Sequence, residues 1–101
     1  MMEKLNTAEM QAFWSAILTL KTPEECACFF EDVCTIKEIQ DISQRLEVAK
    51  LLKSKKVYTE IAALTGASTA TISRVNKCLS YGSGGYGIVL DRLEKEKGKK
   101  G

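Results

Sequence analysis

The chain has 101 residues, 45% of them hydrophobic, which suits one domain over residues 1–101 with a core of moderate size. Small domains of this kind often complete their core by dimerising. It contains no run of about 18 apolar residues and no signal-peptide pattern, so we expect a cytoplasmic protein without a membrane partner. The net charge of +2 hides an asymmetry, because residues 1–42 carry eight acidic groups and three lysines, whereas residues 43–81 carry seven basic groups and two glutamates.

Two helices are predicted before residue 35. Asn6 and Glu9 form a capping pattern, and apolar residues then recur at helical spacing, which predicts a helix over about residues 7–20. Thr22 precedes Pro23 and Glu25, a combination that caps a second helix and closes a capping box. We expect this helix to end near residue 34.

Thr35 and Glu38 repeat the capping box and predict a third helix over about residues 36–54, which contain neither glycine nor proline. Its apolar stripe is broad and includes Ile39, Ile42 and Leu46. A broad stripe implies contact with more than one neighbour, for which a partner subunit is the natural source.

The third helix ends in a basic run that contains Lys50, Lys53, Lys55 and Lys56. Lysines at this position can interact favourably with the negative end of the helix, or they can contact DNA phosphates. Both interpretations can hold together.

Residues 58–77 have the spacing of a helix-turn-helix joined at Gly66, which can adopt the left-handed conformation of a tight turn. Ser68 can cap the second helix. Inward positions fall on Ile61, Leu64, Ile72 and Val75. We hypothesise that the second helix contacts DNA through its outer face, which carries Thr69, Ala70, Thr71, Ser73 and Arg74.

Residues 80–87 are rich in glycine and predict a flexible loop, followed by a last helix over residues 88–97 that folds back over the helix-turn-helix. Gly82, Gly84 and Gly87 match the dinucleotide fingerprint G-x-G-x-x-G. That motif must follow a strand, whereas a helix precedes it here, so we interpret the match as a false positive.

Catalysis and metal binding are not indicated. The sequence has no histidine and no nucleophile beside an evident base, and its glycine segment lacks the lysine of a P-loop. Its four cysteines contain no C-x-x-C pair and are expected to be reduced thiols. We predict neither an enzyme nor a metal cofactor.

The order of these elements resembles the Trp repressor superfamily, most closely its TrpR-like subgroup often called YerC/YecD. The resemblance is carried by T-I-K-E-I-Q-D-I-S-Q-R at 35–45, L-L-K at 51–53 and, above all, L-T-G-A-S-T-A-T-I-S-R at 64–74. It implies an all-α, six-helix fold and an intertwined homodimer joined through residues 1–54. It also implies a transcriptional repressor that binds a palindromic double-stranded operator with half-sites roughly 34–36 Å apart.

The resemblance places the base-proximal positions on short side chains, without an arginine that could make a bidentate contact to guanine. We therefore expect modest, partly water-mediated and shape-dependent specificity. The DNA-contacting set is predicted to be Thr69, Ala70, Thr71, Ser73, Arg74, Lys77, Lys53, Lys55 and Lys56.

The corepressor site that the resemblance implies is altered. Arg45 and Arg74 match the arginines that enclose the tryptophan ring, and Thr35 matches a threonine at its rim. Val75 replaces a glycine that leaves room for the ring, and Cys78 replaces a serine that helps to hold the amino group. We predict a small-molecule corepressor other than tryptophan, or none. Ion pairing or phosphate contact explains the two arginines at least as well.

A second class of function stays open. A helix-turn-helix can also serve only as a packing scaffold in a regulatory or assembly protein. Salt-dependent DNA binding separates the two classes.

Overall fold

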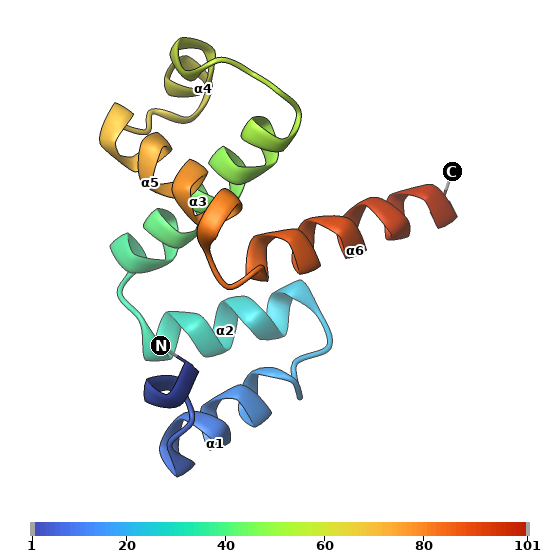
Figure 1. Cartoon of the computed structure of the whole chain (residues 1–101). Coiled ribbons are helices and arrows are strands. Elements are labelled where there is room, and N and C mark those ends of the chain that lie inside the picture. The colour runs from blue at the N-terminus through green and yellow to red at the C-terminus, as the bar shows by residue number, and fades with distance from the viewer. Residues whose placement is uncertain (1, 101) are drawn as a thin grey trace. The chain divides into compact units, whose positions relative to one another are not determined.

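The computed structural model describes the backbone of residues 2–100 and the side chains of residues 4–97. Within this range the chain forms a short 3-10 helix, η1 (Met2–Leu5), six α-helices and no strand, as predicted. Figure 1 shows the helices α1 (Ala8–Ile17), α2 (Pro23–Val33), α3 (Ile36–Lys53), α4 (Tyr58–Thr65), α5 (Thr69–Tyr81) and α6 (Gly85–Lys100). None of the described helices is long and apolar enough to cross a membrane.

Two compact units make up the structure, residues 2–39 and residues 40–100. The boundary between them falls inside α3. The predicted dimerisation segment, residues 1–54, therefore extends over both units and stays a prediction, as does the single domain over residues 1–101.

Threonines cap the helices of the first unit. Thr7, rather than the predicted Asn6, caps α1, because its hydroxyl accepts the Met10 N–H at 3.1 Å. Thr22 accepts the Glu25 N–H at 3.1 Å, while the Glu25 carboxylate accepts the N–H of Lys21 at 2.9 Å. In a capping box the carboxylate accepts the N–H of the cap residue itself, which is Thr22 here. The bond to Glu25 is therefore displaced by one residue from its predicted form.

The predicted box at the start of α3 is complete. The Thr35 hydroxyl accepts the Glu38 N–H at 3.1 Å, and the Glu38 carboxylate accepts the Thr35 N–H at 2.8 Å. The hydrogen bond from the Thr35 backbone N–H to the carboxylate, followed by one from the Thr35 side chain, holds the pKa of Glu38 below its ordinary value. The two bonds of the box fix the short connection between α2 and α3.

The first unit leaves its apolar surface open. α1 and α2 bury none of their residues, although the Phe13 and Phe29 rings lie 6.1 Å apart between centroids. Leu18 is 83% exposed and Val33 is 52% exposed. A helical face of this kind is normally covered by another element.

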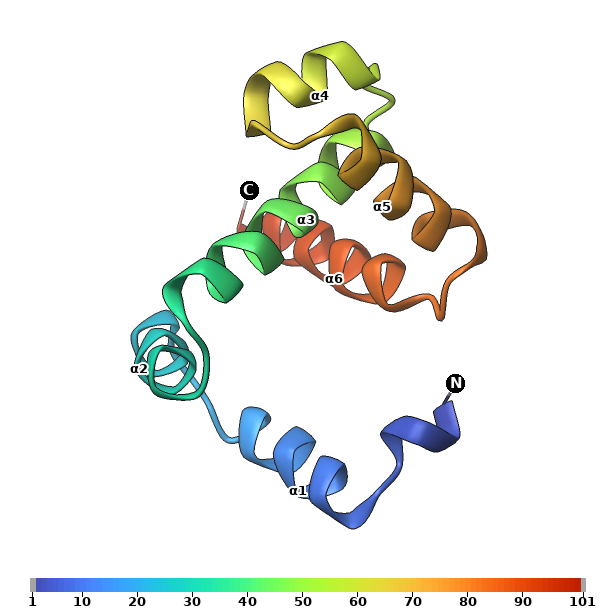
Figure 2. The same ribbon diagram turned by 90° about the vertical axis from the view of Figure 1, so that its left-hand side faces the viewer.

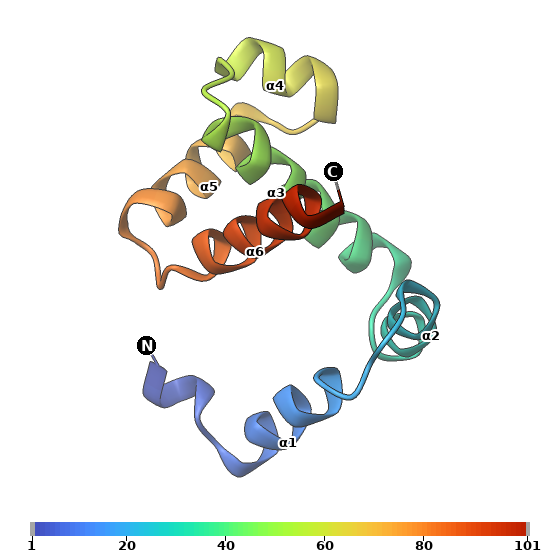
Figure 3. The ribbon, with the colours of Figure 1, turned by 90° about the vertical axis from the view of Figure 1, so that its right-hand side faces the viewer.

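The second unit contains the buried core. Figures 2 and 3 show α4, α5 and α6 gathered around the carboxyl-terminal half of α3. Leu64, predicted to face inward, is instead 64% exposed, because Thr65 follows Ile61 by one helical turn and takes the inward position. The core consists of Val48, Ala49, Ile61, Ala67, Ile72, Val75 and Leu90.

The glycine segment is more helical than predicted. α5 continues to Tyr81 and α6 begins at Gly85, so the expected loop over 80–87 shortens to residues 82–84. A side chain at Gly82 would place its Cβ 2.4 Å from the Cys78 carbonyl oxygen, which explains a glycine there. Glycine inside a helix costs about 1 kcal/mol, and α6 begins with Gly85 and Gly87. Tyr86 between them packs against the core.

Candidate nucleic-acid interface

The turn between α4 and α5 is built by backbone and side-chain hydrogen bonds. Gly66 has φ +76° and donates its N–H to the Ala62 carbonyl at 2.8 Å, which confirms the predicted left-handed turn. The Thr65 hydroxyl donates to the Ile61 carbonyl at 2.7 Å and accepts the Ala67 N–H at 3.1 Å. These contacts set the crossing of the two helices.

Gln44 fastens this turn to α3. Its side-chain amide donates to the Thr65 carbonyl at 3.1 Å. Sequence patterns did not single out Gln44, because its partner lies 21 residues further along the chain. The helix-turn-helix is thereby anchored to the longest helix of the protein.

The first turn of α5 is capped as predicted. Ser68 precedes the helix, and its Oγ accepts the Thr71 N–H at 3.1 Å. The Ser68 hydroxyl also donates to Thr71 Oγ1 at 3.0 Å, a second bond that the capping pattern alone does not predict.

The predicted base-proximal residues share the beginning of α5. Thr69, Ala70 and Ser73 are exposed, whereas Thr71 is half-buried. Ile72 and Val75 are 0% and 1% exposed, so the opposite side of the helix is packed into the core. α5 therefore presents a face of small side chains that a groove could approach closely.

Positive charge extends along the same helix. Arg74 and Lys77 are both exposed. Neither forms an ion pair within the described part of the chain. Both cations are therefore available to an external anion.

The basic run ends α3 in an unusual conformation. The Lys55 N–H donates to the Leu52 carbonyl and the Lys56 N–H donates to the Leu51 carbonyl, each at 3.0 Å, which is a Schellman motif. The position that usually holds glycine is Lys55, with φ 67°. It is the only residue other than glycine with positive φ among residues 2–100.

The three lysines of the basic run that are predicted to contact DNA differ in their pairing. Lys53 Nζ lies 2.6 Å from Asp91 Oδ1, and Lys56 Nζ lies 3.8 Å from Glu60 Oε2. Lys55 has no ion-pair partner among the side chains of residues 4–97. Lys55 therefore carries the one charge of these three that no carboxylate within that range neutralises.

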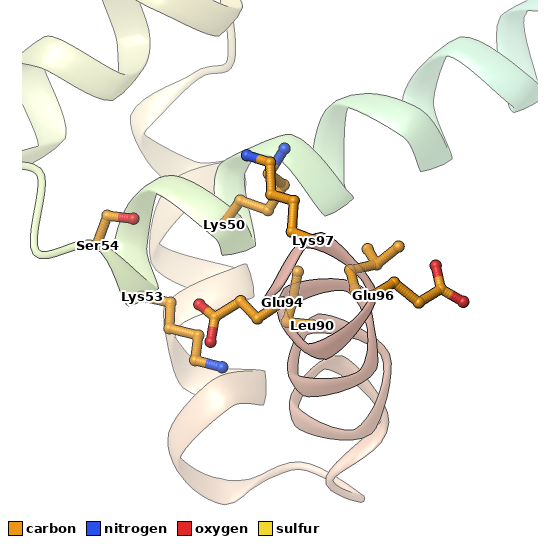
Figure 4. Close-up of a pocket in the computed structure, with 8 residues that line it drawn as sticks. Lys50, Lys53, Ser54, Leu90, Glu94, Glu96 and Lys97 are labelled. Carbon is orange, nitrogen blue, oxygen red and sulfur yellow. The ribbon is translucent and has the colours of Figure 1, made fainter. Parts of the chain in front are cut away.

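The pairing of Lys53 connects α3 to α6. The hydrogen bond between the two side chains raises the pKa of Lys53 and lowers the pKa of Asp91. Lys53 lines a pocket of about 400 Å³ together with Leu90 and Glu94 of α6. Figure 4 shows the side chains of Lys53 and Glu94 next to each other. The ion pair with Asp91 reduces the charge that Lys53 can offer to a phosphate.

The residues of the implied corepressor site lie in different surroundings. Val75 is part of the core, Cys78 is exposed, and Arg45 is half-buried. Neither Arg45 nor Arg74 forms an ion pair within the described side chains, so the ion-pair interpretation gains no support. The Thr35 hydroxyl is engaged in its capping box.

No metal-binding cluster is present in the described part of the chain. It contains no group of three or more cysteine, aspartate or glutamate side chains that could hold an ion. Cys26, Cys28, Cys34 and Cys78 are free thiols.

Comparison with known proteins gives consistent matches. The family model described as Trp repressor protein matches residues 8–94. YerC of Bacillus subtilis (strain 168) is 50% identical over 93 residues, which cover 92% of this chain and 89% of that protein. The crystal structure of a TrpR-like protein from Eubacterium eligens ATCC 27750 is 54% identical, with a TM-score of 0.88 over 91% of this chain and 95% of that chain. The crystal structure of a candidate Trp repressor from Staphylococcus aureus is 50% identical, with a TM-score of 0.88 over 91% and 92%. These matches confirm the resemblance and the all-α, Trp-repressor-like fold predicted from the sequence.

Proposed function

The chain belongs to the Trp repressor family, and we propose that it acts as a homodimeric repressor that binds a specific double-stranded DNA sequence through α4 and α5. The family comprises DNA-binding regulators and not enzymes. The observation that carries the proposal is the exposed face of α5, whose small side chains stand opposite a fully buried face.

The chemistry of this face suits the major groove. Thr69 and Ala70 can approach thymine methyl groups, and the hydroxyls of Thr71 and Ser73 can bond base edges directly or through water. Because none of these side chains makes a bidentate contact, specificity depends partly on DNA shape.

We expect the phosphate contacts to come from the cationic side chains that have no ion-pair partner within the described side chains. Lys55, Arg74 and Lys77 are exposed and lack ion-pair partners within the described side chains, whereas Lys53 and Lys56 are paired with carboxylates. We rank Lys55, Arg74 and Lys77 above Lys53 and Lys56 as phosphate ligands, because a paired lysine must first give up its carboxylate.

The open apolar faces support a dimer. α1 and α2 bury no residue, and Ile36 and Ile42 of α3 are also exposed. A second copy of the chain would cover these faces and would pair the two α5 helices for a palindromic site. Sedimentation at micromolar concentration should show a dimer, and a monomer would contradict this part of the proposal.

The effector, if one exists, is a small molecule other than tryptophan. The Val75 side chain is 1% exposed and belongs to the core, so it occupies volume that a glycine would leave open. Isothermal calorimetry with tryptophan should show no saturable binding, and tight binding would refute this assignment.

Selection of bound sequences from random duplex DNA tests the whole proposal. The purified full chain should enrich a palindrome, with and without a panel of amino acids and nucleotides. Dependence on one additive would identify the effector. If no sequence is enriched under any condition, the helix-turn-helix acts as a scaffold in an assembly protein.

A further inference from the structure

The hydroxyls of two residues at the start of α5 are hydrogen-bonded to each other. Ser68 Oγ accepts the Thr71 N–H at 3.1 Å and donates its own hydrogen to Thr71 Oγ1 at 3.0 Å. A hydroxyl has one hydrogen and two lone pairs. The hydrogen of Ser68 and one lone pair of Thr71 are therefore used inside the protein, and the hydrogen of Thr71 is left.

We propose that Ser68 is a positioning residue that presents the Thr71 hydroxyl to DNA as a hydrogen-bond donor. This inference rests on the proposed function of α5. Thr71 is half-buried, between the exposed Ala70 and the buried Ile72, so its oxygen is held in the first turn while its hydrogen can point outward. Accepting a hydrogen bond from Ser68 also polarises the Thr71 O–H group and makes it a stronger donor.

A donor at this place selects an acceptor atom. In the major groove these are guanine O6 and N7, adenine N7 and thymine O4, whereas cytosine offers an amino group. A phosphate oxygen is also an acceptor. The shared requirement is an oxygen or nitrogen lone pair of the DNA that faces Thr71.

A helix cap alone would behave differently. Loss of a capping hydroxyl weakens the first turn of the helix whether or not DNA is present, and its effect does not depend on the Thr71 side chain. A positioning role for Ser68 acts through that side chain. Coupling between the two residues in DNA binding therefore distinguishes the two roles.

The test uses the full chain and the duplex that the wild-type protein enriches from random DNA. Ser68→Gly removes both hydrogen bonds, while glycine remains an acceptable cap, so the variant should fold. Thr71→Val removes the hydroxyl and keeps the shape of the side chain. Ser68→Thr restores a hydroxyl and serves as the matched control.

Thr71→Val should weaken binding by about 2- to 10-fold per half-site, the usual effect of one hydrogen bond. Ser68→Gly should give a smaller loss that disappears in the Thr71→Val background, and Ser68→Thr should restore binding. Circular dichroism should show unchanged helix content for each variant.

Modified DNA identifies the acceptor. Replacing purines with 7-deazapurines removes single N7 atoms, and methylphosphonate linkages remove single charged phosphate oxygens. A change that weakens wild-type binding without weakening Thr71→Val further identifies N7 or a phosphate as the acceptor, and no such effect from either change assigns the acceptor to guanine O6 or thymine O4.

Two outcomes overturn the inference although the protein binds DNA. Either Ser68→Gly weakens binding equally in both backgrounds, or Thr71→Val leaves affinity and sequence preference unchanged. If no duplex is enriched at all, the proposed function fails instead.

Discussion

Replacing Lys55 with glycine should raise stability and weaken DNA binding at the same time. Lys55 has φ 67°, a left-handed conformation that costs an L-residue roughly 1–2 kcal/mol. Glycine avoids this strain but loses more entropy on folding, by roughly 0.4–1 kcal/mol. Because Lys55 is exposed, little packing is lost, and the net gain is about 0.5–1 kcal/mol. For a chain of this size the melting temperature should rise by about 2–8 °C.

The same substitution removes one phosphate contact from each protomer. The slope of log Kd against log salt should fall by about 0.9 per contact, or about 1.8 for a dimer with two equivalent lysines. Thermal denaturation and fluorescence-anisotropy titrations at several salt concentrations measure the two effects. Lys55→Arg should change neither quantity, and Lys55→Asn should lower the slope as glycine does. An unchanged slope would remove Lys55 from the interface, and a lower melting temperature would refute the strain argument.

Three further predictions concern the surroundings of this site. Lys53→Ala should reduce the salt slope less than Lys55→Ala, because Asp91 already holds Lys53 at 2.6 Å, and an equal reduction in parallel titrations would contradict the ranking of these lysines. Gly66→Ala should lower stability by about 1 kcal/mol in denaturant titrations, because an L-residue at φ +76° is strained. The added Cβ meets nothing within 4 Å, so no clash adds to this strain, and an unchanged midpoint would show that the turn tolerates other residues. Because the folded pKa of Glu38 is lowered, its contribution to stability is present above its unfolded pKa, near 4.3, and is lost as pH falls through the folded pKa. Glu38→Gln should therefore make the free energy of unfolding less dependent on pH below about 5. An identical acid profile would argue against the capping box.

The sequence predicted features that depend on short-range rules. The caps at Thr22 and Ser68 and the left-handed Gly66 follow from residue types at fixed spacing, and all three occur in the structure. Ile72 and Val75 were predicted to face inward from helical periodicity, and both are buried. Local physical chemistry suffices for such features.

Long-range contacts could not be predicted in this way. Asp91 lies 38 residues from Lys53, so no local pattern reveals that it pairs with a predicted phosphate ligand. The left-handed Lys55 was missed because lysine is a poor predictor of that conformation. Leu64 was misassigned because a short helix lets its neighbour Thr65, held by side-chain hydrogen bonds, take the inward position, where Thr65 is half-buried.

The two faces of α5 have different freedom to change over evolution. Ile72 and Val75 support the fold from one side, while Thr69, Ala70 and Ser73 contribute almost nothing to the core. Exposed substitutions of this kind usually alter stability by less than about 0.5 kcal/mol. A duplicated copy of this gene could therefore acquire a new operator through a few changes at these three positions while its scaffold stayed constant.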